Sequence, residues 1–343
     1  MSSTNPLNVL VVGLGPLGRR VISDLYGRGL GQVVAAIDVS PKLVGRDLSE
    51  IVPGVPSGVT VQAHLDEVSD WGAIQSAVVT TSSDLELCMD VFRGLLARGI
   101  AVASTCEELA WPWLRHPIMA AELGELAVRK RGRIVGTGVN PGFLMDALPA
   151  AMTTACRRVD SIRVVRLQDA STRRIPFQRK IGVTMEPGAL KTAVEAGQMG
   201  HVGLGESLHL LAHHVGLEIS RWDETAEPLV AEEELDCGLG TIAVGQCRGL
   251  RQVASAYVPE RENPAVELVF HAAVGEAHPV DRVVIHGEPD LRLEIPGGLH
   301  GDVATSAILL NTLPTLLDAE PRLHTMASLP LRGCARVRET HIR

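Results

Sequence analysis

The sequence predicts an α/β protein: a doubly wound parallel sheet, followed by a second, α+β domain with a mixed or antiparallel sheet. The first part is predicted by a glycine-rich turn after the first apolar run, and by strands that then alternate with helical patterns. The second part is predicted by a change after about residue 145, where β-rich runs joined by glycine and proline turns take over. With 343 residues the chain exceeds one ordinary core, so two domains are expected.

The first forty residues have the order of a dinucleotide-binding βαβ unit. Strand 7–12 leads into a GLGPLG turn, a helical pattern follows, and strand 32–38 ends in Asp38. The three glycines of the turn allow a tight bend, close approach of a pyrophosphate and close helix–strand packing. The helix N-terminus attracts phosphates, and an acid at this distance can bind a ribose diol. We therefore predict a Rossmann domain that binds NAD or NADP through Gly13, Gly15, Pro16, Leu17, Gly18 and Asp38.

The alternation continues through the first domain. Further predicted strands are Ala77–Thr80, Ile100–Ala103 and Arg133–Thr137, and further predicted helices are 83–98 and 118–129. Between them, the segment Asp66–Ser76 is amphipathic. Ser83 and Glu86 have capping-box spacing at the start of the first of these helices, and Gly99 is a natural stop at its end.

The second half predicts a different domain. Ser161–Leu167 alternates like a strand, residues 187–215 are mainly helical, and residues 225–296 hold several β-rich runs. The last helical pattern, Asp302–Leu317, is expected to return to the first domain or to bridge the two domains. We assign residues 1–145 to the cofactor-binding domain and residues 146–300 to a substrate and dimerisation domain.

Ligands of an open α/β sheet collect beyond the carboxyl ends of its strands. Three segments are expected there, and the first, Thr80, Thr81 and Ser82, is assigned to the cofactor. Among the three, Ser104–Glu108 alone carries general acid/base groups, Glu107 and Glu108. The third segment expected at this edge of the sheet is Thr137–Phe143. The two glutamates also suit a helix first turn, and Thr105 with Glu108 has capping-box spacing, so spacing alone leaves catalytic and structural interpretations equally open.

Composition excludes several classes of partner. The net charge is −8 and no run of lysine and arginine interleaves with aromatic residues, which argues against nucleic acid. No apolar stretch approaches the roughly 20 residues that span a bilayer, and the start of the chain lacks a signal-peptide pattern. We expect a cytoplasmic protein without membrane or nucleic-acid partners. The six scattered cysteines form no CxxC pair and are expected to be reduced.

Histidines offer the only hint of a metal. His209, His213 and His214 lie on a predicted helix, with the first two one turn apart. No glutamate makes an HExxH motif and no third ligand lies nearby in the sequence, so a packed or solvated helix face is favoured and no metal is predicted.

Six motifs, in order over both domains, resemble those of the 2,4-diaminopentanoate dehydrogenases and the related native amine dehydrogenases. They are GLGPLG (13–18), STCEEL (104–109), GVNPGFLMD (138–146), QRKIG (178–182), VGLGES (202–207) and GDVAT (301–305). The resemblance implies a dihydrodipicolinate-reductase-like Rossmann domain, a separate substrate domain and a homodimer. It also implies NAD(P)-dependent oxidative deamination of an amine, reversible as reductive amination of a small ketone or aldehyde with ammonia.

The resemblance also implies site residues. The catalytic glutamate falls on the Glu107–Glu108 pair, with Glu108 favoured, and Asn140 would face the nicotinamide. The implied pocket walls are Phe143, Met145, Arg166, Gln168, Phe177, His201 and Thr305. Each has a structural alternative: the first two suit a core, Arg166 suits a surface ion pair, and Thr305 suits packing within a helix.

Several alternatives stay open. A diaminopentanoate enzyme must bind a carboxylate and a second amine, and Arg166, Arg173 or Arg174 could bind the carboxylate. A native amine dehydrogenase has a closed apolar pocket, for which Phe143, Leu144, Met145 and Phe177 are plausible walls. A non-catalytic NAD(P) sensor would give the glutamate pair only a capping role. Asp38 favours NAD, although Lys42 and Arg46 in the next loop could offset its charge.

Two related fold families fit less well. Dihydrodipicolinate reductases carry a His-His-x-x-x-Lys type of motif, whereas His213-His214 is followed by no such lysine. Sugar and inositol dehydrogenases of the Gfo/Idh/MocA type carry Glu-Lys-Pro where this chain has Glu107-Glu108-Leu109. Without that lysine, alcohol oxidation by their mechanism is not expected.

Overall fold

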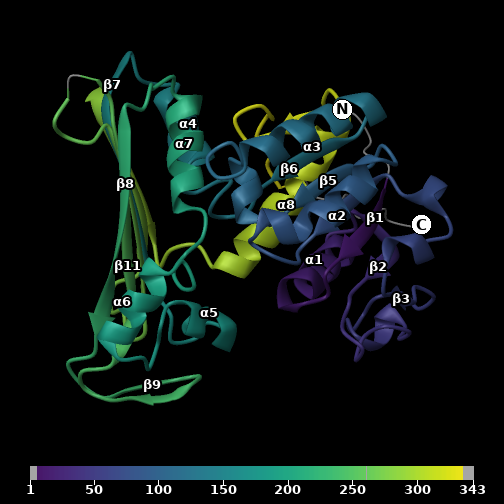
Figure 1. Cartoon of the computed structure of the whole chain (residues 1–343), viewed down its shortest axis with the longest axis horizontal. Helices are drawn as coiled ribbons and strands as arrows, with labels where there is room; N and C mark the ends of the chain where they lie inside the picture. Colours follow the sequence, from purple (N-terminus) through teal and green to yellow (C-terminus); the bar gives the residue numbers. More distant parts are fainter. Residues whose placement is uncertain (1–5, 260, 335–343) are drawn as a thin grey trace, which may run out of the picture. The chain divides into compact units, whose positions relative to one another are not determined.

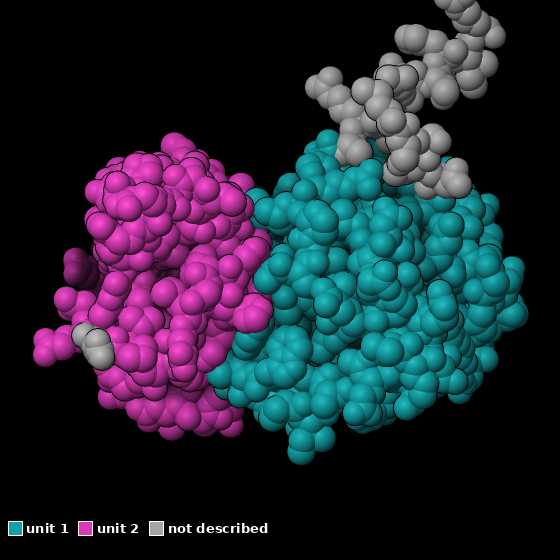
Figure 2. Space-filling model, turned by 90° about the horizontal axis from the view of Figure 1, so that it is seen from above, with its two compact units in different colours: residues 1–143, 300–343 teal, residues 144–299 magenta. Residues whose placement is uncertain are grey.

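The computed structural model describes residues 6–259 and 261–334, and Figure 1 shows the course of the chain. The chain divides into two compact units, coloured separately in Figure 2. Unit 1 consists of residues 1–143 and 300–343, and unit 2 consists of residues 144–299. No helix within the described ranges is long and apolar enough to cross a membrane.

The described part of unit 1 holds a seven-stranded sheet in the order β15-β6-β5-β4-β1-β2-β3, with every neighbouring pair parallel. The strands are β1 (Leu7–Val12), β2 (Gly31–Ile37), β3 (Val61–Gln62), β4 (Ser76–Val79), β5 (Ala101–Ser104), β6 (Arg133–Gly136) and β15 (Leu323–His324). The order reverses between β1 and β4, and ligands bind at such a switch point. The predicted doubly wound sheet is confirmed.

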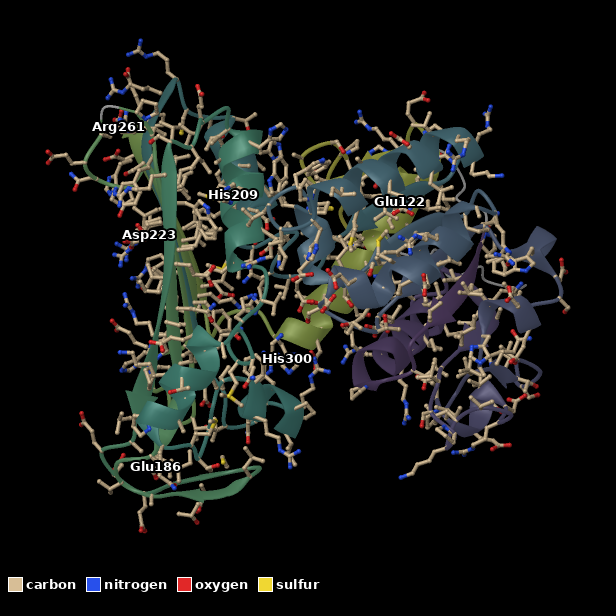
Figure 3. All side chains as sticks on the ribbon, viewed as in Figure 1. Glu122, Glu186, His209, Asp223, Arg261 and His300 are labelled. Carbon is tan, nitrogen blue, oxygen red and sulfur yellow. The ribbon has the colours of Figure 1, made fainter. Side chains whose placement is uncertain are left out.

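The helices of unit 1 cover this sheet and bury its strands. They are α1 (Pro16–Gly27), α2 (Leu85–Leu96), α3 (Pro117–Lys130) and α8 (Gly301–Asp318). Both β4 and β5 are buried along their whole length, as expected for a parallel sheet covered on both faces. The apolar stripe of α2, which includes Leu85, Met89 and Phe92, belongs to the same core. On the exposed side, Arg93 of α2 pairs with Glu122 of α3 at 2.6 Å, and Glu122 is labelled in Figure 3.

The last helix, α8, packs against the first. Ser306 Oγ donates to Asp24 Oδ2 at 2.7 Å, and Arg28 Nη2 donates to Asn311 Oδ1 at 2.6 Å. The predicted final helix is confirmed, and these polar contacts, together with its buried leucines, join it to α1.

One local prediction in unit 1 is wrong. The cap of α2 is Asp84, whose Oδ1 accepts from Leu87 N at 3.2 Å, and not Ser83, because the helix begins one residue later than a Ser83 cap would require. The backbone carbonyl of Ser83 instead accepts a hydrogen bond from Glu108 N at 3.3 Å. The amphipathic segment 66–76 forms no α-helix: it contains the short 3₁₀ helices η2 (Leu65–Glu67) and η3 (Trp71–Ala73).

Within the described residues of unit 2, six strands form a mixed sheet in the order β14-β13-β7-β12-β11-β8. They are β7 (Arg158–Asp169), β8 (Arg221–Val230), β11 (Cys247–Tyr257), β12 (Val266–Ala273), β13 (Val280–Glu288) and β14 (Leu291–Pro296); a small hairpin joins β9 (Leu235–Cys237) to β10 (Gly240–Ile242). The β7–β12 pair is parallel and the other pairs in this sheet are antiparallel. The predicted second domain type is confirmed.

The helices of unit 2 are α4 (Ala147–Thr153), α5 (Ile175–Lys180), α6 (Pro187–Glu195) and α7 (Leu204–His214). In Figure 1, α4 and α7 lie along one face of the sheet. His209, on α7, packs edge-on against Trp222 of β8 with ring centroids 5.1 Å apart, so it has a packing role (Figure 3). No group of three metal-ligating side chains comes together among the residues described.

Candidate functional site

The glycine-rich turn leaves an open space in front of α1. Gly13 has a φ of +93°, and a Cβ on Gly18 would lie 1.9 Å from the Gly13 carbonyl oxygen, so neither position has room for a side chain. Thr80 Oγ1 donates to that same carbonyl at 2.9 Å and ties the turn to the end of β4. No side chain caps α1, and nothing lies within 4 Å of a Cβ built on Gly15. The space at this helix N-terminus suits a pyrophosphate.

Asp38 is fixed beside the turn. Its Oδ2 accepts from Leu14 N at 2.7 Å and its Oδ1 accepts from Ser40 N at 2.8 Å. Each carboxylate oxygen can accept a second hydrogen bond, so a ribose diol can still bind. In the next loop the Arg46 guanidinium contacts Glu50 at 3.1 Å, which reduces its capacity to offset the charge of Asp38. The cradle and this acid together fit a dinucleotide.

Two side chains of the segment after β4 make contacts that stabilise the local backbone and the start of α2. Thr81 Oγ1 lies 3.5 Å from Cys88 Sγ, and Ser82 Oγ accepts from Asp84 N at 3.1 Å. Beneath them the buried thiols of Cys88 and Cys106 meet. A hydrogen bond from Cys106 lowers the pKa of Cys88 to about 7, and the same contact, with burial, raises the pKa of Cys106.

The glutamate pair lies on the short 3₁₀ helix η4 (Glu107–Ala110), directly after β5. Glu108 Oε2 accepts from Leu85 N, the first N–H of α2, at 2.8 Å, and lies 2.9 Å from His116 Nε2. The Glu108 side chain is 16% exposed and that of His116 is 18% exposed. The capping box between Thr105 and Glu108 is wrong, because Cys106 is the N-cap of η4 and the carboxylate turns to α2 instead.

The segment after β6 meets α8. Val139 N donates to Thr305 Oγ1 at 3.1 Å, so the start of α8 is tied to the Asn140–Pro141 turn. Asn140 is 8% exposed, and Phe143 is partly buried. Thr305 therefore holds this loop as well as packing in its helix.

In unit 2, Arg166 is buried in a polar cluster. Its Nη2 donates to Leu299 O at 2.9 Å, and its Nε lies 3.9 Å from Asp281 Oδ1. Asp281 Oδ2 accepts from Leu299 N at 2.7 Å. With its amide oxygen turned toward Arg166, Gln168 accepts from Nε at 2.7 Å. Burial lowers the pKa of Arg166 to about 10 and raises the pKa of Asp281, so this is a desolvated pair.

The remaining predicted pocket residues also lie in unit 2. Gln252 brackets the backbone of His201: its Oε1 accepts from His201 N at 2.7 Å and its Nε2 donates to His201 O at 3.0 Å. The His201 ring stacks on Phe270 at 4.4 Å, and burial lowers its pKa well below the usual value. The Arg173 guanidinium lies 4.3 Å from the centre of the Phe177 ring, and Met145 is fully buried.

Known proteins resemble this chain over nearly all of its length. The family profile described as the 2,4-diaminopentanoate dehydrogenase C-terminal domain matches residues 143–341, more than half of the chain. The chain belongs to this family. The resemblance inferred from the six motifs is thereby confirmed.

Individual proteins that are similar to this member of the diaminopentanoate dehydrogenase family support the same assignment. The 2,4-diaminopentanoate dehydrogenase of Acetoanaerobium sticklandii is 28% identical over 95% of this chain and 94% of its own. The amine dehydrogenase of Streptomyces virginiae is 24% identical over 95% of this chain and 97% of its own. The structure of an amine dehydrogenase from Mycobacterium smegmatis has the same fold, with a TM-score of 0.85, 24% identity and coverage of 96% and 98%.

Two residues in this family member were missed by the sequence analysis. His116 is eight residues from Glu108, and no motif connects them. Asp281 is the cross-strand partner of Arg166 in the β13–β7 pair. Only a correct strand register could have predicted that contact, because the two strands are far apart in the sequence.

Proposed function

We propose that this chain is an NAD(P)-dependent amine dehydrogenase. It deaminates an amine oxidatively and, in reverse, aminates a small ketone or aldehyde with ammonia. One observation carries the proposal. The Glu108 carboxyl group is held just beyond β5, and the turn after β1 of the same sheet forms the dinucleotide cradle. The names of the two curated relatives, a diaminopentanoate dehydrogenase and an amine dehydrogenase, support this reaction class.

Unit 1 supplies the cofactor site. When bound, the nicotinamide cofactor donates or accepts the hydride. The turn from Gly13 to Gly18 and the N-terminus of α1 would bind its phosphates, and Asp38 would accept from the ribose hydroxyls. Asn140, which follows β6, would be on the nicotinamide side of a bound cofactor, and Thr80, Thr81 and Ser82 would help to hold it.

Glu108 moves the protons. In reductive amination, a base must hold ammonia in its nucleophilic form, and an acid must then protonate the carbinolamine hydroxyl as it leaves as water. One carboxyl group that cycles between its two forms can serve both steps. Leu85 N and His116 both contact Oε2 and neither contacts Oε1, so Oε1 is the oxygen that can exchange a proton with the substrate.

Paired substitutions test this role. Glu108→Gln keeps the size and the hydrogen bonds to Oε2, and should lower turnover by roughly 10²–10⁴-fold while the Kd for the cofactor hardly changes. Glu107→Gln is the matched comparison, since neighbouring residues of a 3₁₀ helix point about 120° apart. Near-normal turnover of Glu108→Gln with a large loss in Glu107→Gln would move the role to Glu107, and two active variants would refute it.

A specific observation favours a second candidate, a diamino acid dehydrogenase proper. The buried Arg166 guanidinium has its one nearby carboxylate, Asp281, at 3.9 Å, and Arg173 lowers its pKa further. A buried arginine whose carboxylate neighbour lies 3.9 Å away, beyond hydrogen-bond distance, suits a substrate carboxylate. Absorbance of NAD(P)H, followed with ammonium and a panel of small ketones, and separately with 2,4-diaminopentanoate, distinguishes the two substrate classes. Tight cofactor binding without turnover in either assay would favour an NAD(P) sensor.

We assign different roles to the two units. Unit 1 binds the cofactor; unit 2 supplies Met145, Arg166, Gln168, Phe177 and His201 to the substrate pocket and forms the contact of a homodimer. Phe143 and Thr305 of unit 1 are the other residues that the family resemblance assigns to the substrate. The enzyme acts in the cytoplasm. Light scattering after gel filtration should give twice the mass of one chain, and a monomeric mass would refute the dimer.

A further inference from the structure

The reaction proposed above has a proton balance that must be met from solvent. Near neutral pH, one ketone, one ammonium ion, one reduced cofactor and one proton give one protonated amine, one oxidised cofactor and one water. The carboxyl group that protonates the departing hydroxyl becomes a carboxylate. Glu108 can take that proton from ammonium, so the one further proton of the net reaction, which the product amine needs, must reach the site from solvent, and in the deamination direction it must leave to solvent.

Among the described residues that contact Glu108, one side chain can carry that proton. The carboxylate oxygen Oε2 has two partners, Leu85 N and His116 Nε2. The amide N–H cannot exchange protons rapidly with solvent while it also holds its place at the start of α2. An imidazole can accept a proton on one ring nitrogen and release one from the other.

Backbone hydrogen bonds hold His116 in this position. Its backbone N donates to Pro112 O at 2.8 Å and its carbonyl accepts from Ala120 N at 2.9 Å, so it is fixed at the start of α3. The contact to Oε2 is 2.9 Å, within normal hydrogen-bond range. Because 18% of its side chain is exposed, the ring links a partly buried carboxylate to solvent.

We infer that His116 is a positioning residue that relays protons between Glu108 and solvent. The path runs from solvent to Nδ1, from Nε2 to Oε2 of Glu108, and from the carboxyl group to the reacting oxygen or nitrogen. No other reactant is required, and the net proton of the reaction passes through the ring. The inference rests on the proposed function, since it needs Glu108 to be the acid/base.

Two variants separate relay from support. In His116→Gln, the side-chain amide can still donate to Oε2, but it cannot pass a proton on. We expect kcat for reductive amination to fall by roughly 10²-fold, with an unchanged KM for the ketone and an increased solvent deuterium isotope effect on kcat. In His116→Ala, added imidazole should restore much of the lost kcat.

The control is His209→Gln, which changes a histidine on α7 that packs against Trp222 (Figure 3). It should leave kcat and the isotope effect unchanged. Wild-type kcat and isotope effect in both His116 variants, with Glu108→Gln inactive, would overturn the relay and leave the proposed function intact. Lost activity in His116→Ala without imidazole rescue, and with normal kcat in His116→Gln, would also overturn it, because it would indicate support alone. An active Glu108→Gln would instead refute the proposed acid/base.

Discussion

At the scale of single residues, the cofactor cradle depends on the absence of a side chain at position 18. The nearest atom to a Cβ placed there is a backbone carbonyl oxygen, and a backbone atom in a tight turn cannot move aside cheaply. The same helix offers a matched position, because a Cβ on Gly27 meets nothing within 4 Å. The two glycines therefore separate a steric requirement from the general effect of glycine on chain entropy.

We expect Gly18→Ala to lower the free energy of unfolding by about 1–3 kcal/mol and to weaken cofactor binding. Gly27→Ala should be neutral or stabilise by up to about 1 kcal/mol, because it reduces the entropy of the unfolded chain. Urea denaturation and cofactor titration measure both effects. Equal behaviour of the two variants would show that the close approach of Gly18 and Gly13 does not matter.

Cofactor choice is also decided by single residues. Asp38 should repel a 2′-phosphate, so we expect NAD to be used at least as well as NADP, and Asp38→Asn to raise the NADP-to-NAD ratio of kcat/KM by about tenfold or more. Asn keeps an oxygen for Leu14 N. Because Arg46 is paired with Glu50, Arg46→Ala should leave the ratio unchanged. A wild-type preference for NADP above about tenfold would contradict this expectation.

At the scale of elements, the start of α2 connects three parts of unit 1. Asp84 is the N-cap of α2, and its side chain accepts from Leu87 N. Glu108 of η4 accepts from Leu85 N, the first N–H of the helix, and the carbonyl of Ser83 accepts from Glu108 N. The helix N-terminus thus has both an internal cap and a carboxylate from the next connection. This arrangement makes the position of Glu108 depend on where α2 begins.

We expect Asp84→Ala to lower the free energy of unfolding by about 1 kcal/mol, the usual loss for a removed N-cap. Ser83→Ala should change it by less than about 0.5 kcal/mol, since only the backbone of Ser83 contributes. Denaturant unfolding of both variants measures the difference. A larger loss in the serine variant would restore the capping box predicted from the sequence.

At the scale of the whole molecule, buried histidines make stability depend on pH. Burial is the largest cause of a lowered pKa in His201, His271 and His324. Below an unfolded pKa of about 6.5, the unfolded chain therefore binds protons that the folded chain does not. The free energy of unfolding should fall as the pH drops from 7 through this range.

His324 is the clearest single case, because its ring is 2% exposed and hydrogen-bonded to Glu320 O at 2.8 Å. His324→Gln removes one titrating group. It should reduce the slope of unfolding free energy against pH by at most about 1.4 kcal/mol per pH unit between pH 5 and 6.5. Urea melts across that range measure the slope. An identical slope in the variant would mean that His324 titrates equally in both states.

The sequence alone determined the type of both sheets, the cofactor turn and the alternation of strands and helices in the first domain. These features are local: a strand or helix reveals its buried face through its own period, and the turn from Gly13 to Gly18 is continuous in the chain. The segments expected at the carboxyl edge of the first sheet follow from the same alternation, because parallel strands end on one side.

Only the tertiary structure decided which side chains meet. Thr305 reaches Val139 across 166 residues, and Arg166 reaches Leu299 across 133. Even the short contact from Glu108 to His116 depends on how η4 and α3 turn relative to α2. Such contacts depend on strand register and helix packing, which many distant apolar residues determine together. A single sequence can therefore name the acid beyond β5, but not the partners that orient it.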